Sequence, residues 1–346
     1  MSIRPHLVLC VLMWPGPGCS DAGTHAPEPS QTTAPNNDGS REDRDAVLVA
    51  DASLDDDAGW DVTEAVDEQR DGAVVDAAVA RPPDASETGD GLDGLVRLDL
   101  EFVARVGDGE LACDTLADAV GNGPAIELRD GRFFVHDVRL IRPDGTGEPA
   151  TIARDGRFHN GRVALLDFEN GEGRCETGDP EENHVLRVGV KAGTYRGVAF
   201  RIGVPEDLNH EDPTAAQPPL DVTAMHWGWT AGYRFLRFDT RFDGGGSFNV
   251  HLGSTECSAG SPAGTPVCAR SNRPLIVLAE LDPTRERIVF KYDALVAGLD
   301  PVDDIPGCIA GGTPEQCKPV MAALGLDQTT GDSSGLSQVV FTVEDK

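Results

Sequence analysis

Residues 208–235, LNHEDPTAAQPPLDVTAMHWGWTAGYRF, concentrate metal-binding side chains in a chain of 346 residues. The segment holds two of the eight histidines, His210 and His226, and one of the four methionines, Met225. Imidazole nitrogen and thioether sulfur are ligands of soft and borderline metal ions. We therefore treat His210, His226 and Met225 as candidate metal ligands.

The same segment holds two of the four tryptophans, Trp227 and Trp229. Residues two apart on a strand point to the same face of a sheet, so the two indoles are expected to share a face. They either fill a core, as large aromatic side chains commonly do, or offer an oxidisable indole at the surface. The spacing alone leaves both interpretations open.

Four further histidines can be assigned to the interior or the surface from their local sequence. His136 lies on the apolar face of RFFVHDVRLI, so it is either a core imidazole bonded to a backbone carbonyl or a metal ligand. His251 faces away from the apolar side of SFNVHLG and is a further candidate ligand. His159 and His184 lie in polar, turn-like stretches and are expected at the surface.

The acidic side chains suggest two other functions. A secreted hydrolase would use acids and a histidine for acid–base chemistry, and the candidate cluster is Asp207, His210, Glu211 and Asp212. Against this hypothesis, the sequence contains no nucleophile elbow. An adhesion or structural sandwich would hold calcium with hard oxygen donors, namely Asp167, Glu169, Asp207 and Asp212. The leading hypothesis is a metal-binding protein that is not an enzyme.

The first 19 residues, MSIRPHLVLCVLMWPGPGC, have the outline of a signal peptide. Arg4 precedes a short apolar run that ends in small residues. Gly18-Cys19-Ser20 resembles a bacterial lipoprotein processing site, where the mature chain begins at a lipid-modified cysteine. We expect an extracytoplasmic protein, either periplasmic or anchored to the outer membrane through Cys19, with ordinary secretion as the alternative.

Residues 20–94 are expected to form a disordered acidic linker. They contain 20 Asp and Glu side chains against four arginines, within a chain of net charge −30. Charge repulsion and scarce large apolar residues leave too little burial to offset chain entropy, so the segment is either a tether or a solubilising charge run. Nucleic acid and anionic lipid surfaces are poor partners for this charge, so membrane contact is expected only through the lipid anchor.

Six cysteines remain once Cys10 and Cys19 are assigned to the leader. An even number in an exported chain without a CxxC pair favours disulfides over a zinc site. Proximity in sequence suggests two loop-closing bridges and leaves a third pair: Cys257–Cys268, Cys308–Cys317 and Cys113–Cys175.

Residues 95–346 are expected to fold as one domain. Runs of alternating apolar and polar residues, broken by Gly, Pro, Asn and Asp, predict strands at 96–106, 132–141, 194–204, 233–242, 246–254, 274–281 and 287–293. Helical periodicity is weak and is confined to CDTLADAV and PEQCKPVMAALGL. This pattern favours an all-β antiparallel β-sandwich with long loops.

Several strings occur together in an order that resembles the MbnP-like copper-binding proteins, the metallo-mystery-pair four-Cys family. They are RFFVHDVRLI, LLDFENGEGRC, YRGVAFRIGVPEDLNHED, PLDVTAMHWGWTAGYRF and FNVHLGSTEC, and the resemblance covers about residues 97–300. It implies a secreted β-rich domain, often encoded beside a dihaem cytochrome c peroxidase-like protein, which would be the partner of this chain.

The resemblance also implies a copper site. In the methanotroph members, histidines hold Cu(I) together with a tryptophan oxidised to kynurenine in a Trp-x-His arrangement. The matching string here is Phe134-Val135-His136, so no modified residue can form at position 134, while His136 and His210 remain as a ligand pair. Met225 would be a weak third donor, which suits the geometry of Cu(I). Trp227 or Trp229 is then the candidate for oxidation, by the partner, because nothing in this chain supplies an oxidising cofactor.

Overall fold

The structure is a computed structural model that describes residues 75–76, 89–117, 125–175, 178–243, 245–259, 264–297, 307–310, 314–333 and 337–346. The expected leader, Cys19 and most of the expected linker lie outside these residues. Two pieces of the linker are described. Val75–Asp76 (β1) pairs with Thr194–Tyr195 (β10), and in residues 89–94 the side chain of Leu92 is buried.

The larger sheet is organised around one long strand, β5 (Ile126–Ile141). Its strands run in the order β18 (Leu275–Leu278), β11 (Gly197–Ile202), β5, β14 (Leu236–Phe242), β15 (Ser247–Leu252) and β20 (Gly307–Ile309). β4 (Leu116–Ala117), β6 (Gly147–Pro149) and β8 (Val163–Asp167) also pair with β5. Residues 130–136 of β5 are all buried, so both faces of the strand are covered there, since successive side chains point to opposite faces.

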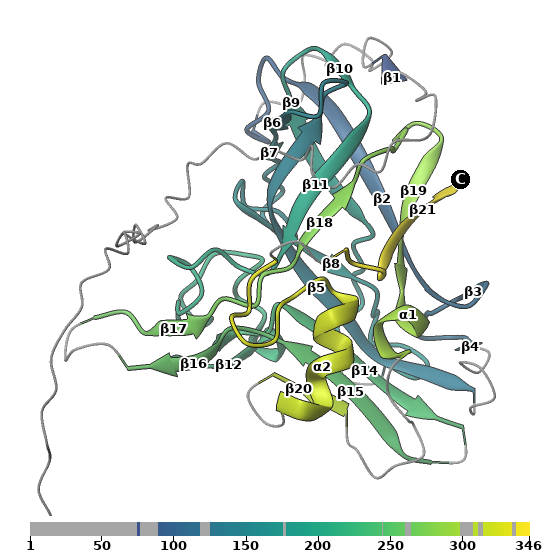
Figure 1. Cartoon of the computed structure of the whole chain (residues 1–346), viewed down its shortest axis with the longest axis vertical. Coiled ribbons are helices and arrows are strands. Elements are labelled where there is room, and N and C mark those ends of the chain that lie inside the picture. Colours follow the sequence, from purple (N-terminus) through teal and green to yellow (C-terminus); the bar gives the residue numbers. More distant parts are fainter. Residues whose placement is uncertain are drawn as a thin grey trace, which may run out of the picture. The chain divides into compact units, whose positions relative to one another are not determined.

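The second sheet has the order β21 (Phe341–Asp345), β19 (Glu286–Lys291), β2 (Val96–Val106), β9 (Val185–Val190) and β7 (Thr151–Ile152). β3 (Gly109–Glu110) pairs with β2. Most strand pairs are antiparallel, but β15–β20 and β19–β2 are parallel. The all-β prediction is confirmed, and these two parallel pairs are a detail that the alternation of residues does not reveal (Figure 1).

Short elements connect and flank the two sheets. Two separate hairpins are formed by β12 (His226–Gly228) with β13 (Gly232–Tyr233), and by β16 (Thr255–Ser258) with β17 (Val267–Arg270). Within the described ranges the helices are η3 (Thr223–Met225), α1 (Tyr292–Val296) and α2 (Pro314–Ala323). The helical prediction is confirmed for PEQCKPVMAALGL. It is wrong for the described part of CDTLADAV, where Leu116–Ala117 extends the sheet as β4.

An aromatic cluster joins the two sheets. Phe133 of β5 lies 5.8 Å from Phe290 of β19 and 5.6 Å from Phe341 of β21, measured between ring centroids. Phe238 of β14 stacks on Phe290 at 4.3 Å. Apolar residues at every second position of β14 and β19 produce this arrangement, because alternate side chains of a strand share one face. The interior of the sandwich therefore lies between the larger sheet and the second sheet.

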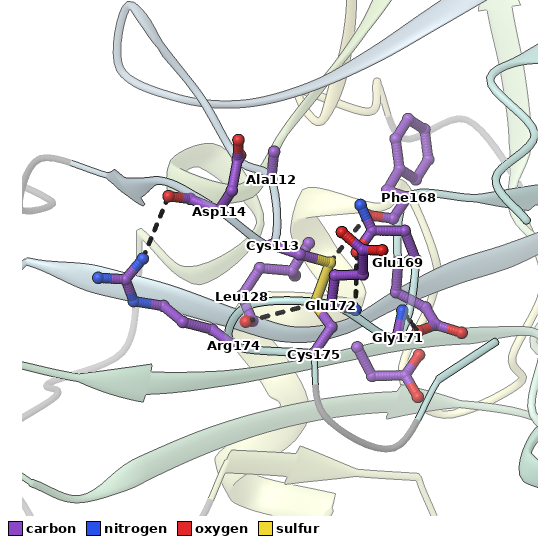
Figure 2. Close-up of a disulfide and its surroundings, with 12 residues drawn as sticks. Ala112, Cys113, Asp114, Leu128, Phe168, Glu169, Gly171, Glu172, Arg174 and Cys175 are labelled. Atoms are coloured by element: carbon purple, nitrogen blue, oxygen red, sulfur yellow. Dashed lines mark hydrogen bonds between the residues drawn. A yellow bond between two sulfur atoms is a disulfide. The ribbon is translucent and has the colours of Figure 1, made fainter. Parts of the chain in front are cut away.

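The three disulfides are those expected from the sequence: Cys113–Cys175, Cys257–Cys268 and Cys308–Cys317. Cys113–Cys175 is buried and fixes the FENGEGRC loop against the larger sheet (Figure 2). Its sulfurs lie 3.7 Å from the carbonyl oxygen of Phe168 and 3.5 Å from that of Leu128. These are contacts and not hydrogen bonds, because a disulfide sulfur carries no hydrogen to donate.

Candidate metal site

His136 is a buried imidazole at the centre of β5, on the apolar face that alternation predicts. Its Nδ1 donates a hydrogen bond of 2.9 Å to the carbonyl oxygen of Gly203, which leaves the lone pair on Nε2. Burial first, and the Arg273 guanidinium second, lower the pKa of His136 to about 3. The ring is therefore neutral at physiological pH, as a metal ligand must be.

His210 is also buried, and it is oriented in the same way. Its Nδ1 donates to the carbonyl oxygen of Trp229 at 2.8 Å, and its Nε2 accepts the Nδ2–H of Asn209 at 3.2 Å. Gly232 makes this arrangement possible, since its φ is +76° and a Cβ there would lie 2.6 Å from Asn209. The loop and the β12–β13 hairpin thus fix the orientation of the His210 ring.

His136 and His210 belong to segments that contact one another. Phe134, two residues before His136, packs edge-on against Tyr233 with 5.8 Å between the ring centroids. The backbone amide of Tyr233 in turn donates to the Oδ1 of Asn209, next to His210. Phe134 is fully buried and is therefore a core residue.

A disulfide adjoins His210, which the sequence does not suggest. The Sγ of Cys268 lies 3.6 Å from the Nε2 of His210. The ligand atoms of His210, Cys257 and Cys268 all lie within 4.8 Å of one another. The two cysteines are 47 and 58 positions from His210, so no spacing in the sequence could have indicated this group. In the bonded state neither sulfur is a thiolate, and only the imidazole is a strong ligand.

His226 and Met225 have different environments. The His226 ring packs against Tyr233 at 4.8 Å, and its buried Nε2 has no hydrogen-bond partner among the described residues. Burial lowers the pKa of His226, and the charges of Arg234 and His210 act in the same direction. Met225 is fully buried in the main apolar core.

His251 serves an ionic network of the larger sheet. Its Nε2 is 2.6 Å from the Oδ1 of Asp239, which also pairs with Arg237. Although burial raises the pKa of Asp239, its bonds to His251 and Arg237 bring that pKa below its usual value. The Nε2 that would bind a metal is therefore already engaged by Asp239.

The two tryptophans differ in exposure. Trp229 is 51% exposed, whereas Trp227 is half-buried. The Arg234 guanidinium carbon lies over the indole of Trp227, 5.4 Å from the centroid of the indole ring. It also packs so closely on Gly253 that a Cβ there would lie 2.4 Å from the indole. Core packing therefore does not account for the exposed Trp229 indole, and the backbone carbonyl of Trp229 accepts the hydrogen bond from His210.

Two further histidines, His159 and His184, lie among the described residues, and the surface prediction holds for one of them. His159 is fully buried, and the surface prediction for it is wrong. Its Nδ1 lies 2.7 Å from the Oδ2 of Asp155, and its Nε2 accepts the backbone N–H of Arg187, so it holds a turn against β9. His184 is 37% exposed and stacks on Phe168.

The acids proposed for calcium are engaged with other groups. Asp207 forms an ion pair of 2.8 Å with Arg162, and Asp212 accepts hydrogen bonds from Thr214. Asp167 and Glu169 belong to a buried network in which Arg132 pairs with Asp130 and Glu169. The geometry does not support the acid–base cluster of a hydrolase either, because the Nδ1 of His210 bonds a backbone carbonyl and not a carboxylate.

These features define a disulfide-containing, extracytoplasmic β-sandwich protein with buried histidines in a loop-rich region. Among the described residues no helix is long and apolar enough to cross a membrane. The chain belongs to the MbnP family, whose profile matches residues 96–310. Its structure is similar to that of MbnP from Methylosinus trichosporium, with a TM-score of 0.62 and 25% sequence identity, covering 72% of this chain and 98% of that one. None of the curated proteins matches the sequence.

Proposed function

We propose that this protein is an extracytoplasmic copper-binding protein and not an enzyme. The observation that carries the proposal is the shared orientation of His136 and His210. Each buried imidazole donates its Nδ1–H to a backbone carbonyl, which fixes the ring and leaves Nε2 as the ligand atom. Neutral imidazole nitrogens are good copper ligands, and a pair of them suits Cu(I).

The charge near His136 favours a monovalent ion. Arg273 is buried, donates from Nε to the carbonyl oxygen of Val204, and pairs with Glu206 at 2.7 Å. Its charge is one reason why the His136 imidazole resists protonation. The same repulsion acts on a bound cation and grows with the charge of that cation. Cu(I) is therefore favoured over Cu(II) or Zn(II) at this position.

The test is a Cu(I) titration of the disulfide-intact protein against a chromophoric competing chelator. The wild type should bind one ion, and His136→Ala and His210→Ala should each lower the affinity at least tenfold. His184→Ala is the matched control, since His184 is half-exposed and stacks on Phe168. Unchanged Cu(I) affinity in both single variants would show that the site lies elsewhere.

We further propose a dihaem cytochrome c peroxidase-like protein as the partner. The exposure of the Trp229 indole, and the hydrogen bond from His210 to the Trp229 backbone carbonyl, support oxidation of this tryptophan. Conversion of tryptophan to kynurenine is a four-electron oxidation, with the oxidising equivalents supplied by the haem partner. It cleaves the indole C2–C3 bond with addition of two oxygens, and hydrolysis then releases C2 as formate, so the residue loses one carbon and gains one oxygen. Peptide mass spectrometry of protein produced with and without the partner should find this change in residues 221–234. Unmodified Trp227 and Trp229 in the presence of the active partner would contradict it.

The proposed localisation is the periplasm, with an outer-membrane lipid anchor at Cys19. The three disulfides support an oxidising compartment, and the signal-like leader supports export. Membrane fractionation of the wild type and of Cys19→Ser tests the anchor. The wild type should sediment with outer membranes, and the variant should not.

A further inference from the structure

The β16–β17 hairpin differs from the other disulfide regions in being accessible. Cys257 and Cys268 are half-buried, whereas the cysteines of the other two bridges are at most 5% exposed. The hairpin is a separate two-stranded sheet, outside both layers of the sandwich (Figure 1). A dithiol reductant can therefore reach this S–S bond without opening the core.

We propose that this hairpin is a redox-gated metal site, in which reduction of Cys257–Cys268 creates two thiolate ligands beside the imidazole of His210. The reductant, a dithiol, gives two electrons and two protons to the S–S bond, and its own two sulfurs become a disulfide. A soft or borderline cation then binds both cysteine sulfurs, and the two thiol protons are released. The disulfide form lacks these two ligands.

The distances fit a thiolate–imidazole centre. A metal ion about 2.3 Å from sulfur and about 2.0 Å from nitrogen, at a tetrahedral angle, separates the two ligand atoms by about 3.5 Å. The observed distance from the Sγ of Cys268 to the Nε2 of His210 is 3.6 Å. Cys257 and Cys268 are direct partners across the hairpin, so the two thiols stay adjacent after the bond opens.

The tautomer of His210 also fits. Its Nδ1–H is fixed on the carbonyl of Trp229, so the lone pair of Nε2 faces the sulfurs. That lone pair at present accepts the amide of Asn209, a neutral bond that a metal ion would replace. Three protein ligands leave one coordination position of a tetrahedral ion open.

The base of the hairpin does not depend on the disulfide. The Nδ2 of Asn272 donates to the carbonyl of Gly253 and to the Oγ1 of Thr255. The Oγ of Ser254 donates to the carbonyl of Ser271. These hydrogen bonds hold the two strands together after reduction, so the two cysteines stay near His210 and little ordering is needed for metal binding.

The proposal shares His210 with the copper site but does not rest on it, since it needs neither His136 nor copper. The first experiment treats the folded, full-length protein anaerobically with limiting dithiol, alkylates it, and maps the labelled cysteines by mass spectrometry. Label should appear at Cys257 and Cys268 before the other pairs. Equal or earlier labelling of the buried cysteines would overturn the proposal.

The second experiment titrates Co²⁺, whose thiolate charge-transfer absorption reports sulfur ligands. Selectively reduced wild type should develop this absorption with one equivalent, and the oxidised protein should not. His210→Ala should weaken Co²⁺ binding at least tenfold, while His184→Ala should leave it within twofold. No charge-transfer band in the reduced protein, or a band that His210→Ala leaves unchanged in affinity, would overturn the proposal.

Two controls keep the outcome decisive. The double variant Cys257→Ser with Cys268→Ser should lack the band, and reduced wild type alkylated at both sulfurs should lack it without any substitution. A band that survives either treatment would assign the thiolates to other cysteines and overturn the proposal. Failure of Cu(I) to bind the oxidised protein, by contrast, would refute only the copper function, because that experiment is done with the disulfide intact.

Discussion

Protonation of His136 should couple the stability of the metal-free protein to pH. The folded-state pKa of His136 is about 3, whereas an unfolded histidine has a pKa of about 6.5. Between these values the unfolded chain binds a proton that the folded chain excludes, so stability falls as the pH falls from 6.5 towards 3. From pH 7.5 to 5.0 the loss attributable to His136 is about 2 kcal/mol.

The assay is urea unfolding of the disulfide-intact protein in the presence of a metal chelator, at pH 7.5 and 5.0. His136→Gln removes the titrating group, so it should lose about 2 kcal/mol less than the wild type across this interval. Other groups contribute equally to both proteins and cancel in the comparison. His184→Gln is the control and should follow the wild type. The reasoning is refuted if His136→Gln and the wild type lose the same free energy.

Three further predictions concern the core. Burial, with repulsion from Glu169, raises the pKa of Asp167 to about 8, so the free energy of unfolding should fall as the pH rises from 4 to 8. In urea unfolding at several pH values, Asp167→Asn should reduce this slope by about 1 kcal/mol per pH unit, and an unchanged slope would contradict the prediction. The double variant Cys113→Ser with Cys175→Ser opens the 62-residue loop that this disulfide closes, and it should lower the free energy of unfolding by about 4 kcal/mol. A loss below about 1 kcal/mol would contradict this prediction. Phe133→Ala should cost about 3 to 5 kcal/mol in the same assay, because its ring contacts four other phenylalanine rings, and a loss below about 1 kcal/mol would show that this contact is not essential to the core.

Local pattern was sufficient for much of the fold. The alternation in VRLDLEFVARV predicts a strand at 96–106, and β2 has these bounds. The short sequence separations of Cys257–Cys268 and Cys308–Cys317 indicated the right pairs, since nearby cysteines close small loops. The alternation of apolar and polar residues also predicted that His136 lies on the buried face of β5. Each of these features depends on neighbours within about a dozen residues.

Features that depend on register were not predictable. Arg237 of β14 faces His251 of β15 in the antiparallel ladder, and Asp239 lies diagonally within reach of the imidazole. A shift of the ladder by one residue would move His251 to the other face, so its bond to Asp239 cannot be read from SFNVHLG alone. The contact of His210 with Cys268 is similar, because it joins a loop to a separate hairpin 58 positions away.

The candidate ligands are oriented by backbone atoms, and this explains how the site can survive changes in the surrounding side chains. Both histidines donate to carbonyl oxygens, so their ring positions depend on chain conformation. Two glycines fix that conformation. Gly203 has a φ of +123° and packs on Phe235, and Gly232 has a φ of +76° and packs on Asn209, so a Cβ at either would lie within 2.9 Å of its neighbour. The buried phenylalanine at position 134 leaves both glycines and both carbonyl bonds in place, so the two imidazoles keep their orientation.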